Sequence, residues 1–191
     1  MAERHFPARF NYRTWANKSI PCLILLRAKM DLKRQRLPAG FLRRPAYLIA
    51  SGFGIGLLPL APGTFGTLIG VGLYFGMVQL PLAYYGATVI VLFLLGIFVC
   101  ERTTATLGVH YHPSIVWDEV VGYLITMTAV PPQWIWVALG FALFRIFDIL
   151  KPWPVRAIDQ HVGGGFGVML DDALAGAYAS IGVQTAMFLT Q

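Results

Sequence analysis

The sequence has few charged residues. Of its 191 residues, 13% are Asp, Glu, Lys or Arg and 57% are hydrophobic, whereas an average soluble domain carries about 25% charged residues. This composition excludes an intrinsically disordered chain and favours lipid as the surroundings of much of the protein. Cysteine is also scarce: Cys22 and Cys100 lie too far apart in sequence for a zinc-binding pair and are too few for a disulfide framework. No secretory cleavage pattern is present.

The positive charge that the chain does carry lies at its N-terminus. Residues 1–44 hold eleven of the fifteen basic residues and only two acids, for a net charge of +9. This stretch is predicted to be a flexible leader on the anionic, cytoplasmic face of a membrane. No nucleic-acid partner is expected, because no basic surface interleaved with aromatic residues follows it. Residues 45–191 are predicted to form the membrane-embedded domain.

Three charge-free stretches follow, at residues 66–100, 120–144 and 173–191. One helical crossing of a bilayer needs about 20 residues. The first stretch therefore predicts a hairpin that turns at residues 80–82, and the second predicts two crossings interrupted at residues 131–133. The sequence thus indicates an all-α, integral membrane helical bundle with about five crossings. Its oligomeric state is not predicted.

With five crossings, every charged cluster after residue 45 lies on the same side of the membrane as the leader. Burying ionisable groups costs several kcal/mol each unless they are paired or bind a cation. A functional site at this face is therefore expected. The segment Ala46–Leu60 is apolar but rich in glycine and proline, which weaken helices. It is predicted to be re-entrant or interfacial.

Two acidic pairs stand out in apolar surroundings. Asp118 and Glu119 lie within a helical run, about 100° apart around its axis, so that at most one of them points squarely into a shared site. Asp171 and Asp172 follow the run Gly163–Gly167, which is predicted to be a flexible loop before the last crossing. Helix capping explains one aspartate there, but not two.

Basic residues and a turn accompany these acids. Arg145, Asp148 and Lys151 recur every three residues on one helix face, which Pro152 ends; the pattern suits either a site or an internal salt bridge. The loop Ala61–Thr67 enters a helix, and with Thr64 it either binds an anion or is a structural turn. His110 and His112 lack the third ligand of a zinc site and are interpreted as structural or phosphate-side residues.

After residue 45 the clusters hold seven carboxylates and four bases. An excess of hard oxygen ligands beside Arg and Lys is what Mg²⁺-assisted phosphoryl chemistry needs. The substrate expected at such an interface is a phosphorylated lipid, whose head group reaches the charges while its acyl chains stay in the bilayer. A divalent-cation carrier is the alternative from another class, although carrier acids are expected near the bilayer midplane.

Four motifs in order, at residues 52–67, 116–122, 144–154 and 163–176, resemble the phosphatidylglycerophosphatase A family. The resemblance covers residues 46 to about 185 and leaves out the basic leader. It implies a multi-pass protein of the bacterial inner membrane that faces its active site to the cytoplasm. The implied reaction removes the terminal phosphate of phosphatidylglycerophosphate, with Mg²⁺, and yields phosphatidylglycerol.

The resemblance also implies roles for individual residues, and it leaves open whether water or an aspartate attacks phosphorus. The implied catalytic and metal-binding acids are Asp118, Glu119, Asp148, Asp171 and Asp172. The implied phosphate or head-group contacts are Thr64, Arg145, Lys151 and Arg156. Two other lipid enzymes are excluded, since the sequence has neither the Asp-Gly…Ala-Arg run of phosphatidyltransferases nor the Pro-Ser-Gly-His of histidine-nucleophile lipid phosphatases.

Overall fold

A computed structural model describes residues 43–107, 112–155 and 161–190. Within these ranges the protein has six α-helices, one short 3-10 helix and no strand, which confirms the predicted all-α class. The predicted leader falls almost entirely outside them. The elements in chain order are α2 (Pro45–Ala50), η3 (Ile55–Leu57), α3 (Pro62–Met77), α4 (Leu82–Leu107), α5 (Trp117–Thr126), α6 (Trp134–Leu150) and α8 (Gly164–Leu189).

The breaks between helices lie close to the positions predicted from the prolines and from the charge-free stretches. The turn at residues 78–81 separates α3 from α4, residues 127–133 separate α5 from α6, and α6 ends at Leu150, just before Pro152. Two helices, α4 and α8, are long and apolar enough to cross a membrane. The most apolar part of α4 is only 17% buried. Within the described residues the structure therefore supports two crossings by length and composition, and the five predicted crossings are not confirmed.

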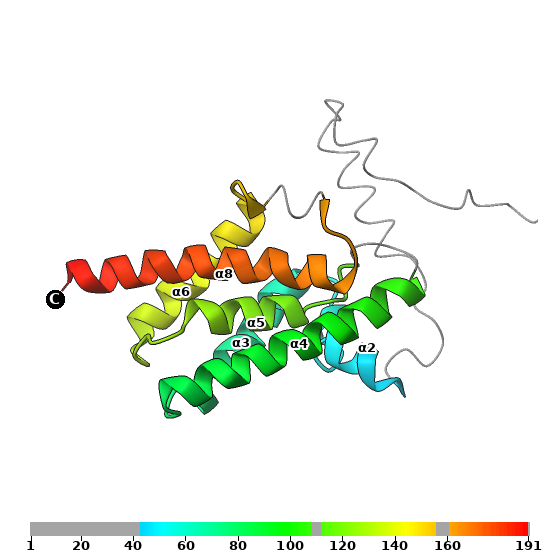
Figure 1. The fold of residues 1–191 in the computed structure, drawn as a ribbon, viewed down its shortest axis with the longest axis horizontal. Coiled ribbons are helices and arrows are strands. Elements are labelled where there is room, and N and C mark those ends of the chain that lie inside the picture. Colours follow the sequence, from blue (N-terminus) through cyan, green and yellow to red (C-terminus); the bar gives the residue numbers. More distant parts are fainter. Residues whose placement is uncertain (1–42, 108–111, 156–160, 191) are drawn as a thin grey trace, which may run out of the picture. The chain divides into compact units, whose positions relative to one another are not determined.

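Helix α5 lies at the centre of the bundle, between α4 and α8 in Figure 1, and packs against α3, α4, α6 and α8. Nearly all of its ten residues are buried. A Cβ atom added at Gly176 of α8 would collide with the carbonyl oxygen of Gly122 of α5. Glycine at these positions therefore allows the two backbones to touch, in the manner of small-residue packing between membrane helices.

The short helix α5 ends inside the protein, where its last carbonyl groups need donors. A tyrosine hydroxyl supplies one of them: Tyr85 of α4 donates to the carbonyl oxygen of Leu124 at 2.7 Å. In the turn that follows α5, Tyr74 of α3 donates to the carbonyl oxygen of Val130 at 2.7 Å. Since water is absent from a lipid environment, such internal partners allow a helix to stop within the bundle.

The segment predicted to be re-entrant or interfacial contains only the six-residue α2 and the three-residue η3. Six helical residues span about 9 Å, so this part of the described chain contains no crossing helix. The segment packs against the residues that precede α5: the amide of Val116, the N-cap of that helix, donates to the carbonyl oxygen of Ala50 at 2.9 Å. Its place at a membrane interface stays a prediction.

Candidate active site

Three carboxylates from two helices meet at the start of α5. Asp118 and Glu119 lie in its first turn, and Asp172 lies in the third turn of α8. All three are buried, and ligand oxygens from the three residues lie within 4.8 Å of one another. The acidic cluster, as these residues are called below, forms because the glycine contact between Gly122 and Gly176 draws the two helices together.

The acidic cluster has unsatisfied oxygen atoms. Asp118 Oδ1 accepts a hydrogen bond from the amide of Glu119 at 3.1 Å. In the described part of the chain, Asp118 Oδ2, Glu119 Oε2 and Asp172 Oδ2 have no hydrogen-bond partner. Buried, mutually repelling carboxylates are costly unless a cation compensates them. The cluster is therefore compatible with a divalent metal ion, and its oxygen ligands suit a hard one.

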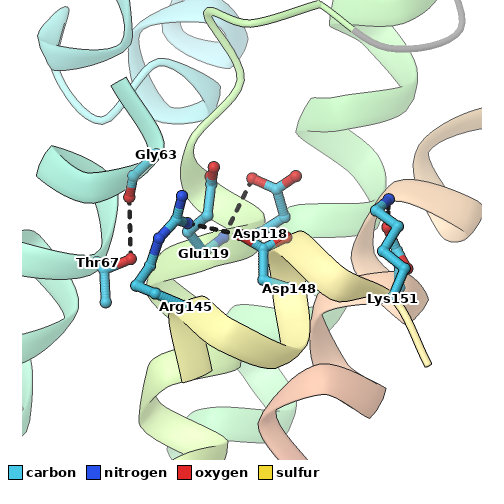
Figure 2. A network of polar contacts seen from close by, with 8 residues as sticks. Gly63, Thr67, Asp118, Glu119, Arg145, Asp148 and Lys151 are labelled. Atoms are coloured by element: carbon cyan, nitrogen blue, oxygen red, sulfur yellow. Dashed lines mark hydrogen bonds and ion pairs between the residues drawn. The ribbon is translucent and has the colours of Figure 1, made fainter. Parts of the chain in front are cut away.

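The start of α3 joins the cluster through Gly63. A Cβ atom added there would collide with Glu119 Oε1 and would lie 3.1 and 3.2 Å from the terminal nitrogens of Arg145. Only glycine therefore allows these two side chains to lie against the first turn of α3, an arrangement visible in Figure 2. Thr64 follows in the same turn, half-buried, with its amide donating to the carbonyl oxygen of Ala61.

Two ion pairs border the acidic cluster. Arg145 Nη1 donates to Asp148 Oδ2 at 2.6 Å within α6, as the three-residue spacing allows. Lys151 follows the end of α6 with a φ of 44°, in the left-handed region, and its Nζ contacts Asp171 of α8. Lys151 therefore does not continue the helical face of Arg145 and Asp148, but reaches across to another helix.

The five predicted acids thus fall into two groups. Three form the acidic cluster, and Asp148 and Asp171 lie in ion pairs with the two predicted phosphate contacts. Another predicted substrate contact, Arg156, lies outside the described residues, as does His110. Of the four predicted substrate contacts, Arg145 lies against Gly63, in the first turn of α3.

The glycine run before α8 differs from its prediction. It is helical from Gly164 onward instead of forming a flexible loop, and Gly163 is the N-cap. A Cβ atom at Gly165 would collide with the backbone of Ile97 and Glu101 in α4, so glycine here permits close helix packing. Because α8 begins so early, Asp171 and Asp172 do not cap it.

Two further polar residues lie near these elements. Glu101, which sequence reasoning did not select, accepts a hydrogen bond through Oε2 from the amide of Gly165 at 2.5 Å. The sequence feature that could have pointed to Glu101 is its position as the first charged residue after the charge-free stretch 66–100. His112 is buried, with Nδ1 at 2.7 Å from Ser114 Oγ. Burial lowers the pKa of His112, so its ring is neutral at pH 7.

Comparison with known proteins finds a matching family model and similar bacterial proteins. The family model described as Phosphatidylglycerophosphatase A matches residues 48–187. A protein of that name from Escherichia coli is 42% identical over 159 residues, which cover 83% of this chain and 91% of the relative. Another from Haemophilus influenzae is 49% identical over 146 residues, 73% of this chain and 87% of the relative.

A protein from Bacteroides thetaiotaomicron, named as a putative phosphatidylinositol-3-phosphatase, is 41% identical over 160 residues, 78% of this chain and 99% of the relative. No solved structure matches the chain significantly.

Proposed function

Because this chain belongs to the phosphatidylglycerophosphatase A family, whose members are phosphatases, we propose that it hydrolyses the terminal phosphate monoester of phosphatidylglycerophosphate. Water supplies an oxygen to the released phosphate, the bond between phosphorus and the glycerol oxygen breaks, and that oxygen takes up a proton. The products are phosphatidylglycerol and inorganic phosphate. The observation that carries the proposal is the acidic cluster, with unsatisfied buried oxygens beside two side-chain cations.

Asp118, Glu119 and Asp172 are the residues that would hold the metal, which we propose is Mg²⁺ because all the ligands are carboxylate oxygens. When bound, Mg²⁺ supplies Lewis-acid neutralisation of charge on the phosphate oxygens. Asp118, Glu119 and Asp172 repel one another in their buried positions, and a bound cation would compensate that repulsion.

The remaining charged residues orient the phosphate. Arg145 offers a planar fork of donors, which matches phosphate geometry, and it lies at the first turn of α3, whose positive helix end also favours an anion. Lys151 offers a second positive charge next to α8. Asp148 and Asp171 hold these cations in position. Thr64 and Arg156 are proposed as further head-group contacts on the basis of the sequence motifs.

We place the protein in the bacterial inner membrane, with the catalytic face toward the cytoplasm. In this arrangement α4 and α8 cross the bilayer, and the shorter α3, α5 and α6 complete the multi-pass bundle around the site. Large apolar side chains are exposed on α3, α4, α6 and α8, as lipid contact requires. The basic leader lies on the cytoplasmic side, in keeping with the positive-inside rule.

The test is phosphate release by the purified, detergent-solubilised full chain from phosphatidylglycerophosphate, with Mg²⁺ or with a chelator. Release that requires Mg²⁺ is expected. An absence of release in both conditions would overturn the proposal. Uptake of Mg²⁺ into dye-loaded proteoliposomes, measured on the same preparation, separates the phosphatase from the alternative cation carrier, for which uptake without hydrolysis is the expected result.

A further inference from the structure

The loop that precedes α3 exposes an unusual amount of apolar surface. Residues 52–61, called the apolar loop below, expose Phe53 by 66% and Leu60 by 78%, and Leu57 and Leu58 are exposed as well. Loops that face water are normally polar. A cluster of four large apolar side chains on one short loop marks an interaction surface.

The backbone of the apolar loop is held firmly. A Cβ atom at Gly52 would lie 2.7 Å from Ile69 Cδ1 and 2.9 Å from Val116 Cγ2, and one at Gly56 would collide with the carbonyl oxygen of Ser114. The loop therefore packs against α3 and the approach to α5 on its glycine side. Its apolar side chains point away from these contacts, and their exposure follows from a defined structure.

The backbone conformation at Phe53 also directs a side chain away from the protein. Its φ is 57°, in the left-handed region that a bulky side chain seldom adopts. The flanking Gly52 and Gly54 are also at positive φ, and the amide of Gly54 donates to Ser51 Oγ at 3.2 Å. The local backbone thus holds an aromatic ring outward, where it buries little of its surface within the protein.

The apolar loop runs directly into the catalytic face. It ends at Ala61, two residues before Gly63, which touches Glu119 and Arg145. Trp153, which follows α6 and the ion pair of Arg145, is 82% exposed. Tryptophan is enriched at the level of lipid head groups. Apolar side chains therefore border the end of the bundle at which the phosphate is proposed to bind.

Two arginines precede the loop in the chain, on the far side of the short helix α2. Arg43 and Arg44 are exposed, and Arg44 Nη1 donates to the Tyr47 hydroxyl at 3.4 Å. Exposed arginines and exposed apolar side chains within one short segment match an anionic bilayer surface, where arginines meet phosphates and apolar groups enter the acyl boundary.

We propose that the apolar loop is inserted into the cytoplasmic membrane interface and contacts the acyl chains of anionic lipids beside the catalytic face. A lipid substrate then slides along this loop, with its phosphate at the acidic cluster and its chains still in the bilayer. Insertion of the loop is independent of the proposed reaction, whereas the contact with substrate rests on it.

Spin labels test the insertion. The full chain carrying Cys22→Ser, with the buried Cys100 retained, is labelled at Phe53→Cys or Leu60→Cys and reconstituted into vesicles of phosphatidylethanolamine and phosphatidylglycerol. Leu94→Cys in α4 serves as the control for lipid exposure and Gln133→Cys for a polar turn. We expect the spin labels at both loop positions to collide more often with oxygen than with a water-soluble nickel complex.

Two results of this experiment would overturn the proposal. Stronger collision with the nickel complex would place the apolar loop in water. Immobile labels that neither reagent reaches would show that protein covers the loop, either the leader of this chain or a second copy. Both results are independent of catalysis, so that they do not depend on whether the proposed reaction is correct.

A kinetic experiment tests the contact with substrate. The double variant Phe53→Ser and Leu60→Ser is expected to lower kcat/KM for long-chain phosphatidylglycerophosphate in vesicles, relative to a short-chain dispersed analogue, by about tenfold. The matched control is Leu82→Ser, which replaces an exposed leucine at the first residue of α4, outside the apolar loop, and should leave this ratio unchanged. An unchanged ratio in the double variant would exclude the substrate contact, whereas hydrolysis of neither substrate by the unmodified chain would contradict the proposed reaction.

Discussion

Replacing Asp172 by Asn should change stability in opposite directions with and without metal. Asn has nearly the same shape as Asp, so the contact between the backbone of residue 172 and Gly122 stays intact. One of the three carboxyl groups disappears from the acidic cluster. Without metal the remaining two carboxylates repel less, whereas with metal one anionic ligand is missing.

The separation of the carboxylates sets the size of the effect. At an effective dielectric constant of about 20, two unit charges at the 4.8 Å limit of the acidic cluster repel by about 3 kcal/mol. Relaxation and solvent reduce what can be measured, so we expect a net gain of about 1–2 kcal/mol in the metal-free protein. For a protein of this size, 1 kcal/mol shifts the melting temperature by about 2–4 °C.

With Mg²⁺ the sign reverses. Loss of one ligand should weaken metal binding at least about tenfold, which corresponds to about 1.4 kcal/mol, and should abolish phosphate release. Thermal unfolding followed by tryptophan fluorescence, in detergent with chelator and across a Mg²⁺ titration, measures both effects. Asp148→Asn is the control: it strands the mostly buried Arg145 and should destabilise the protein in both conditions. Near-normal turnover, or unchanged stabilisation by Mg²⁺, in well-folded Asp172→Asn protein would refute Asp172 as a ligand.

Three further outcomes are expected. Gly63→Ala should lose most phosphate release because its Cβ collides with Glu119, whereas Gly72→Ala, in the same helix with open space around it, should keep wild-type activity; equal activities would contradict the close contact at residue 63. Glu101→Ala should lower stability by about 1 kcal/mol through loss of the acceptor for the Gly165 amide, and Glu101→Gln should restore most of it, as thermal unfolding would measure. Deletion of residues 1–40 should spare phosphate release in detergent, and a loss there would make the leader part of the enzyme.

Helix ends were predictable because they depend on local chemistry. Pro81, Pro131 and Pro152 lie where helices stop or turn, since proline lacks the amide that a continuing helix needs. The positions of the acidic pairs on helices followed from the apolar runs around them. The number of membrane crossings was less predictable, because α5 is only ten residues long and the carbonyl oxygen of Leu124 in its last turn accepts a hydrogen bond from a tyrosine of another helix, α4.

The sequence also did not predict that the five acids fall into an acidic cluster and two ion pairs, because this separation depends on contacts between different helices. The spacing of Arg145, Asp148 and Lys151 places all three on one helix face, but the helix ends at Leu150 and Lys151 turns toward Asp171 of α8. The glycine run before α8 looked like a loop because glycine favours turns. Its helical form depends on the close approach of α4 at Ile97 and Glu101, a contact that no local pattern reveals.

These contacts explain how a protein can keep an acidic cluster in an apolar bundle. The distance between the acids of α5 and Asp172 is set by backbone contact at Gly122 and Gly176, about one turn farther along each helix, and not by an ion pair within the cluster. The two nearby cations, Arg145 and Lys151, form their ion pairs with Asp148 and Asp171 and not with the three acids of the cluster. The acids therefore stay close together with no ion pair of their own among the described residues, which leaves them available to the proposed metal ion and phosphate substrate.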